Sequence, residues 1–164
     1  MEAIFHRISV RKYEDRPVEP EKIERLLRAA MAAPSAHNQQ PWEFYVVTDR
    51  QTLDALAAGS RYMKPLSRAP LGIVVCCRKA CVMPEYAHHD CGAATENLLL
   101  EADALGLGAV WMGGAPRPER IAVAQQVLHL PEELEAFAFI ACGYPAETRP
   151  QQDRYDPARV HRVE

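Results

Sequence analysis

Residues 33–42 read A-P-S-A-H-N-Q-Q-P-W and separate two segments of different periodicity. Pro34 and Pro41 fix the backbone at the two ends, so the stretch can extend neither the segment before it nor the one after it. Between the prolines lie a hydroxyl, an imidazole and three amides, which are short-range hydrogen-bonding groups typical of turns. The stretch is therefore predicted to be a functional loop between a helix and a strand.

The segments on both sides of this loop support that assignment. Before it, Pro20 suits a first helical position, and Pro34 ends the helical pattern. Residues 42–48 (W-E-F-Y-V-V-T) are aromatic and β-branched, which is typical of a strand. The apolar residues before the loop recur at helical spacing; they are Ile23, Leu26, Leu27, Ala30 and Met31.

The rest of the chain alternates between the same two kinds of segment. Asp49 is expected to cap a helix at 50–58. Continuous apolar runs predict buried strands, with helical patterns between them. These segments are a strand at 71–77, a long helix at 85–105, a strand at 109–112, a helix from 118 to about 130, and a strand at 137–142. The order predicts a single α+β domain, residues 1–164, with helices covering a four-stranded sheet.

Two segments have no evident partner in this scheme. The helix at 85–105 is apolar around much of its circumference, which is typical of a helix central in a core or buried in a subunit interface. The tail at about 146–164 is rich in Pro and Arg and has no period. Such a tail is expected either to fray or to lie across another surface.

Composition argues against several classes of protein. The net charge of −3 argues against a dedicated nucleic-acid binder. No apolar run approaches the roughly 18 residues of a membrane helix, and the first residues lack the pattern of a signal peptide. Five cysteines without a C-x-x-C spacing predict reduced thiols and a cytoplasmic location.

A candidate anion site lies near the start of the chain. Arg7, Ser9 and Arg11 alternate with Ile8 and Val10, so an extended backbone places the three polar groups on one side. Two guanidinium groups and a hydroxyl suit a phosphate dianion. The alternative, two solvated surface arginines, stays open at this point.

A double glycine follows the predicted strand at 109–112. Without Cβ atoms, Gly113 and Gly114 allow a flat ligand to lie against the backbone, where an N–H can point at it. The alternative is an ordinary turn at the end of a strand. Gly106 and Gly108 are not a dinucleotide fingerprint, because they precede a strand instead of following one.

Metal and hydrolase sites have little support. Cys76 and Cys77 are neighbours on a strand and face opposite sides, and the histidines near residue 88 lack ligand spacing. Ser35 and His37 do not form a triad by themselves, and no G-x-S-x-G is present. No metal is expected, and the roles of four cysteines stay open; they are Cys76, Cys77, Cys81 and Cys91.

Five motifs, in this order, resemble the FMN-dependent nitroreductase family. They are R-x-S-x-R-x-Y at 7–13, the loop at 33–42, H-D-C-G-A-A-T-E-N-L-L-L-E-A at 89–102, A-L-G-L-G-A-V-W-M-G-G at 104–114 and G-Y-P-A-E at 143–147. The resemblance covers nearly the whole chain. It implies the family's fold, a mixed and mainly antiparallel sheet of four or five strands with helices on both faces and a long central helix at a dimer interface.

The resemblance also implies which residues hold FMN. Arg7 and Arg154 would bind the phosphate, Ser9 the phosphate or ribityl chain, and Arg11 the pyrimidine edge of the flavin. Positive charge at that edge stabilises the anionic reduced ring.

The ring itself would lie between two subunits. The Gly114 N–H, next to Gly113, would face flavin N5, the atom that accepts hydride. Residues of the loop would reach the ring from the partner subunit; they are Pro34, Ser35, Ala36 and Asn38. The implied assembly is an obligate homodimer with the tail wrapped over the neighbour.

The implied reaction is a ping-pong transfer of hydride from NADH or NADPH, through flavin N5, to a nitroaromatic, quinone or similar acceptor. No side chain is nominated as catalytic, because the cofactor carries the chemistry. Two alternatives stay open. One is an FMN storage or delivery protein, and the other is a related flavoenzyme with different chemistry, such as dehalogenation, ene reduction or flavin fragmentation. The short stretch at 59–69 leaves little room for a lid, so acceptor specificity is not predicted.

Overall fold

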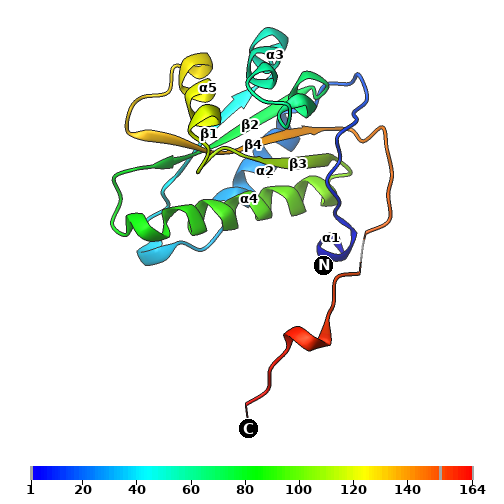
Figure 1. Ribbon diagram of the computed structural model, residues 1–164. Coiled ribbons are helices and arrows are strands. Elements are labelled where there is room, and N and C mark those ends of the chain that lie inside the picture. Colours follow the sequence, from blue (N-terminus) through cyan, green and yellow to red (C-terminus); the bar gives the residue numbers. More distant parts are fainter. Residues whose placement is uncertain (1, 152, 164) are drawn as a thin grey trace.

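A computed structural model describes residues 2–151 and 153–163. Its centre is a four-stranded sheet in the order β1-β2-β4-β3, with every neighbouring pair antiparallel (Figure 1). The strands are β1 (Trp42–Val47), β2 (Leu71–Arg78), β3 (Gly108–Gly113) and β4 (Leu134–Gly143). The strands β2 and β4 are therefore central, and β1 and β3 form the edges. This sheet confirms the predicted α+β class.

Helices cover both faces of the sheet, as predicted (Figure 1). The helices α2 (Pro20–Met31) and α4 (Ala87–Ala104) pack on one face, and α3 (Arg50–Ala58) and α5 (Pro118–Leu128) pack on the other. A short helix, α1 (Ala3–His6), lies beside α4. The molecule therefore has three layers with two separate apolar cores.

The strand β2 separates these two cores. Its first seven residues are buried, because both faces of the strand are covered. Cys76 belongs to the core under α3 and α5, and Cys77 belongs to the core under α2 and α4. The two thiols thus face opposite sides of the sheet, as predicted.

The starts of two elements differ from the prediction by two residues or more. The strand β4 begins at Leu134 instead of residue 137, because Leu134 and Glu135 pair with Arg78 and Cys77 of β2. The helix α4 begins at Ala87, after a 3₁₀ turn at Pro84–Tyr86. In the part of the chain that the structure describes, no helix has the length and apolar character needed to cross a membrane.

Polar contacts connect the start of α2 to the end of β4. The Tyr144 hydroxyl donates to the Glu19 carboxylate, with O–O distances of 2.7 and 2.9 Å, and accepts from Lys22 Nζ at 2.9 Å. The Arg16 guanidinium lies 3.7 Å from the centre of the Tyr144 ring. The hydrogen bond from Tyr144 is the main cause that lowers the pKa of Glu19 from 4.5 to about 2.

We expect Tyr144→Phe to lower the melting temperature in a pH-dependent way. Because folding lowers the Glu19 pKa, the stabilisation is complete above pH 4.5 and is lost as the pH falls toward 2. Melting curves of wild type and Tyr144→Phe should therefore differ at pH 6 and converge as the pH falls through about 2. Tyr155→Phe, at a side chain exposed by 76%, is the control. A difference that stays the same from pH 6 to pH 2 would contradict this account.

Candidate functional site

Four arginines surround a cavity beside the edge strand β3. The cavity has a volume of about 290 Å³, and its lining includes Arg7, Ser9, Arg11 and Arg154. The resemblance assigned Arg7, Ser9 and Arg154 to the phosphate or ribityl chain of FMN and Arg11 to the pyrimidine edge, and the structure brings these four residues together. The fourth arginine, Arg149, was not predicted. It lies in the same Pro- and Arg-rich tail as Arg154, and the arginine content of that tail is the signal that could have identified it. We call this space the phosphate cavity.

The phosphate cavity is built by backbone pairing between distant segments. Ser9 forms a parallel bridge with Ala109 of β3, and the Val10 N–H donates to the Ala109 carbonyl at 3.0 Å. Gln151 in the tail donates from Nε2 to the carbonyl oxygens of Ile4 and Arg7, at 3.0 and 3.2 Å. The extended N-terminal segment therefore adds to the outer edge of β3, and the tail closes over it.

The Glu147 carboxylate neutralises part of the positive charge at this cavity. Glu147 accepts from the backbone N–H of Arg11 at 2.8 Å and pairs with the Arg149 guanidinium at 2.7 Å. The Arg11 hydrogen bond is the main cause that lowers the pKa of Glu147, and it is followed by the Arg149 contact. Arg7 has a looser partner, Glu96 Oε1, at 3.4 Å. The side chains of Arg11 and Arg154 have no ion pair among the described residues. The lining of the phosphate cavity therefore carries more positive than negative charge.

The loop at 33–42 is held by the first turn of α4. Asp90, which is only 6% exposed, accepts from the Ala36 N–H at 3.0 Å and from Gln39 Nε2 at 2.6 Å. The Ser35 hydroxyl accepts from the Gln40 N–H at 3.0 Å. These bonds fix the backbone and leave the loop residues Pro34 and Asn38 exposed. Sequence reasoning missed the role of Asp90, because the contact spans 54 positions.

Three residues of this loop have left-handed backbone conformations. The φ angles of His37, Asn38 and Gln40 are 50°, 54° and 45°. Residues other than glycine adopt this region at an energetic cost, and such residues cluster at binding sites. The Asp90 contacts supply the constraint that holds the loop in this shape. This strained backbone, held by contacts from α4, makes the loop a candidate binding element.

The loop and the phosphate cavity contact α4 at different turns. The loop bonds Asp90 in the first turn, whereas Arg7 of the phosphate cavity contacts Glu96 near the middle of the helix. At 1.5 Å per residue Asp90 and Glu96 are about 9 Å apart along the helix. None of the predicted ring-contacting loop residues is among those that line the phosphate cavity.

The two glycines have different surroundings. The Gly114 N–H donates to the Phe137 carbonyl at 2.8 Å, so it is occupied within the sheet. This corrects the expectation that the Gly114 N–H faces flavin N5. Hydrogen-bonded and open pairs alternate along an antiparallel ladder, and Gly113 pairs with Ala138 at an open position. The Gly113 N–H therefore points to the outer edge of β3.

Arg120 of α5 contacts the backbone of Gly113 at the end of β3. Its Nη1 donates to the Gly113 carbonyl at 2.8 Å, and its guanidinium carbon lies 5.2 Å from the centre of the Tyr62 ring. Its Nε is buried and has no hydrogen-bond partner among the described residues. Arg120 thus fixes the peptide of Gly113 and connects it to the segment around Tyr62. No local pattern in the sequence indicates this contact.

The cysteines and histidines do not gather into a metal site. Among the described residues no three His, Cys, Asp or Glu side chains lie close enough to share an ion. A hydrogen bond with Cys77, together with burial, raises the pKa of Cys91, and burial raises the pKa of Cys76 to about 12. These two thiols are therefore protonated at neutral pH and are poor nucleophiles or ligands. His88 instead bonds Glu135, at 2.7 Å.

Comparison with known proteins gives consistent matches over the whole chain. The model of the nitroreductase family matches residues 4–62 and 60–144. A relative from Archaeoglobus fulgidus, provisionally named NADH dehydrogenase/NAD(P)H nitroreductase, is 41% identical over 99% of this chain and 96% of its own.

Two solved structures extend this comparison. An FMN-dependent nitroreductase from Clostridium difficile has a TM-score of 0.92 at 29% identity, over 99% of this chain and 98% of its own. A provisionally named nitroreductase from Desulfovibrio desulfuricans, solved in complex with FMN, has a TM-score of 0.84 at 36% identity, over 99% and 95%.

Proposed function

The chain belongs to the nitroreductase family, and from this premise we propose that it is an FMN-dependent oxidoreductase that uses NADH or NADPH. The observation that carries the proposal is the phosphate cavity beside the open edge of Gly113. A phosphate dianion needs several cationic donors, and a flat ring needs backbone without side chains. Both requirements are met by adjacent parts of one edge strand.

The residues present fit FMN. Arg7, Arg154 and Ser9 would hold the phosphate, with Arg149 as a further donor on the cavity wall. Arg11 would supply positive charge at the pyrimidine edge, and the Gly113 N–H would donate to N5. These residues would thus hold a cofactor that supplies hydride transfer from a nicotinamide donor to an acceptor, and we propose that donor and acceptor use the site in turn, in a ping-pong sequence.

The remaining part of the site is proposed to come from a second copy of the chain. The loop residues Pro34 and Asn38 are exposed and do not line the phosphate cavity of their own chain, so we infer that a two-fold related copy supplies them. The tail also exposes apolar side chains that have nothing to pack on within the chain. These are Tyr155, Val160 and Val163, exposed by 76%, 52% and 98%. We therefore propose a homodimer with FMN between the subunits.

Steady-state kinetics test the reaction. Initial rates are measured with NADPH or NADH as donor and menadione, a quinone, as acceptor, and both concentrations are varied. The proposal predicts turnover and parallel lines in double-reciprocal plots. Intersecting lines would contradict the ping-pong order. Bound FMN without turnover would instead support the storage or delivery alternative.

A further inference from the structure

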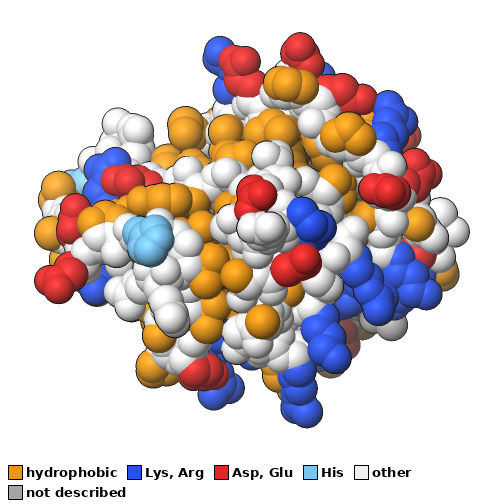
Figure 2. Space-filling model, turned by 90° about the horizontal axis from the view of Figure 1, so that it is seen from above, with side chains coloured by type: hydrophobic (Ala, Val, Ile, Leu, Met, Phe, Trp, Pro, Cys, Tyr) orange, Lys and Arg blue, Asp and Glu red, His pale blue; other side chains and the backbone are white. Residues whose placement is uncertain are grey.

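Arg120, in the first turn of α5, is a partly buried cation without a counter-charge. Among the described residues it has no ion pair. The arginines that do have a carboxylate partner are Arg7, Arg16, Arg25, Arg28, Arg50, Arg78, Arg149 and Arg159. Figure 2 shows the face covered by α3 and α5 from above, with Lys and Arg side chains gathered mainly at its lower right border. Arg120 therefore differs from these exposed cations in its burial and from the paired arginines in its lack of a carboxylate.

The position of Arg120 is unfavourable for stability in two respects. A cation in the first turn of a helix lies at the positive end of the helix dipole. In addition, the Nε of Arg120 is buried and has no hydrogen-bond partner among the described residues, and a buried donor without a partner destabilises the folded state. Residues that oppose stability in this way are typical of functional sites. The contacts that Arg120 does make indicate what that function is.

Arg120 holds one end of the peptide that joins Gly113 to Gly114. Its Nη1 donates to the Gly113 carbonyl at 2.8 Å, and at the other end of this peptide the Gly114 N–H donates to the Phe137 carbonyl at 2.8 Å. Two successive glycines have few steric restrictions on their backbone angles, so the end of β3 would otherwise be free to rotate. Arg120 therefore keeps Gly113, the last residue of β3, in its strand conformation.

The same contact brings a positive charge to the outer edge of β3. In an antiparallel ladder the N–H and the C=O of one residue point to the same side. Gly113 pairs with Ala138 at an open position, so both of its polar groups point to the outer edge. The Arg120 guanidinium, which donates to the Gly113 carbonyl, therefore lies on the same edge as the Gly113 N–H. A ligand that accepts a hydrogen bond from this N–H meets a fixed cation beside it.

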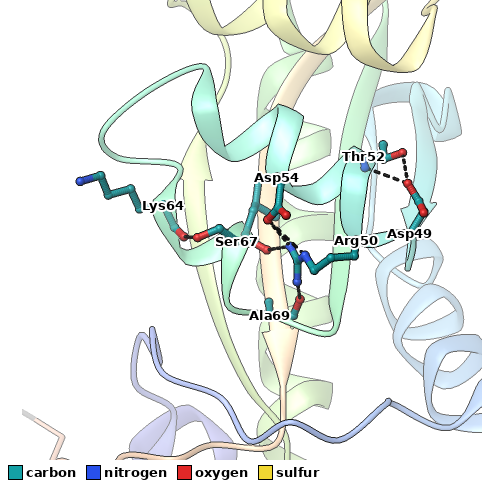
Figure 3. Close-up of polar contacts among 8 residues, drawn as sticks. Asp49, Arg50, Thr52, Asp54, Lys64, Ser67 and Ala69 are labelled. Atoms are coloured by element: carbon teal, nitrogen blue, oxygen red, sulfur yellow. Dashed lines mark hydrogen bonds and ion pairs between the residues drawn. The ribbon is translucent and has the colours of Figure 1, made fainter.

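The guanidinium packs on a segment that is itself anchored. The guanidinium carbon of Arg120 lies 5.2 Å from the centre of the Tyr62 ring. The chain that follows Tyr62 is attached to α3, because Arg50 donates to the Leu66 and Ala69 carbonyls at 2.7 and 3.0 Å (Figure 3). The position of the charge is therefore set before a ligand binds.

We propose that Arg120 is a positioning residue for hydride transfer, which orients Gly113 toward flavin N5 and raises the reduction potential of bound FMN. Reduction adds negative charge to the flavin, and charge near N5 is one of the means by which a protein adjusts this cofactor. A fixed cation in a partly buried position stabilises the reduced form more than the oxidised form. The inference rests on the proposed function, since it concerns the cofactor of that same site.

The test compares the reduction potential of bound FMN in wild type, Arg120→Met and Arg120→Lys, by anaerobic titration against a reference dye. Met removes both the charge and the hydrogen-bond donor, whereas Lys keeps both. Arg117→Met is the matched control, because Arg117 is an exposed arginine directly before α5 and its loss changes the net charge by the same amount. The dissociation constant of oxidised FMN and the melting temperature of each apoprotein are also measured. Arg120→Gln, which keeps a donor without the charge, replaces Arg120→Met if the latter does not fold.

Arg120→Met, or Arg120→Gln in its place, should weaken the binding of reduced FMN at least about tenfold more than that of oxidised FMN, which lowers the potential by about 30 mV for a two-electron couple. Arg120→Lys should recover most of this shift, and Arg117→Met should show none. An unchanged potential without the Arg120 charge, an equal shift in Arg117→Met, or no recovery in Arg120→Lys would overturn the inference. A wild-type protein that binds no FMN would instead mean that the proposed function fails.

Discussion

Gly113→Val should abolish FMN binding while the protein remains folded. A Cβ at Gly113 meets nothing closer than the Ala115 carbonyl oxygen at 4.0 Å, so the fold accommodates a side chain there. The branched side chain would occupy the open edge where the ring must approach the backbone. Flavin absorbance of the purified protein and its melting temperature measure the two effects separately.

Gly114→Ala is the contrasting control. A Cβ at Gly114 would lie 2.3 Å from the Ala136 carbonyl oxygen and 3.1 Å from that of Phe137. Backbone atoms cannot rotate away as a side chain can, so we expect the free energy of unfolding to fall by about 1–3 kcal/mol or more. Full FMN content in Gly113→Val, or unchanged stability in Gly114→Ala, would contradict the assignment of these two positions.

Arg7→Ala should weaken FMN binding strongly. A charge-assisted hydrogen bond contributes roughly 1.5–3 kcal/mol, which corresponds to about a 10- to 150-fold rise in Kd. Glu96 competes only weakly for Arg7, since the two charged groups are 3.4 Å apart. Fluorescence titration of the apoprotein with FMN measures the affinity, with Arg28→Ala as the control. An unchanged Kd would remove Arg7 from the site.

Arg7→Ala, combined with a variant of the loop, also tests whether the site is shared between subunits. Asn38→Ala removes an exposed side chain of the loop, and we expect it to reduce FMN binding as well. If the loop serves the partner's phosphate cavity, a mixed dimer of Arg7→Ala and Asn38→Ala contains one intact site. Unfolding and refolding the two variants together should then restore part of the tight FMN binding. If a verified mixed dimer recovers no tight FMN binding, Arg7 and Asn38 would belong to one site within the same chain, and the shared site would be contradicted.

The secondary structure could largely be predicted because its signals are local. The prolines at 20, 34 and 41 mark the ends of segments, and the apolar run of β2 indicates burial on both faces. The start of β4 could not be predicted, because Leu134 and Glu135 become strand residues by pairing with β2. The 3₁₀ turn at Lys64–Ser67 likewise depends on contacts with α3.

The candidate site was predictable only in part, for the same reason. The alternation of Arg7, Ser9 and Arg11 is visible in the sequence, and the three side chains do line one cavity. Which glycine N–H is open depends on the register between β3 and β4, which local sequence does not encode. The same is true of Asp90, whose partners in the loop lie about fifty positions earlier.

The visible absorption spectrum of the purified protein, before and after NADPH or NADH is added without air, is the most direct test of the central claim. The account predicts flavin bands that bleach on addition of the donor, after the protein is supplied with FMN if it purifies without it. A protein that remains colourless after incubation with FMN would contradict the assignment of the phosphate cavity and of Gly113. Flavin bands that neither donor bleaches would contradict the oxidoreductase function.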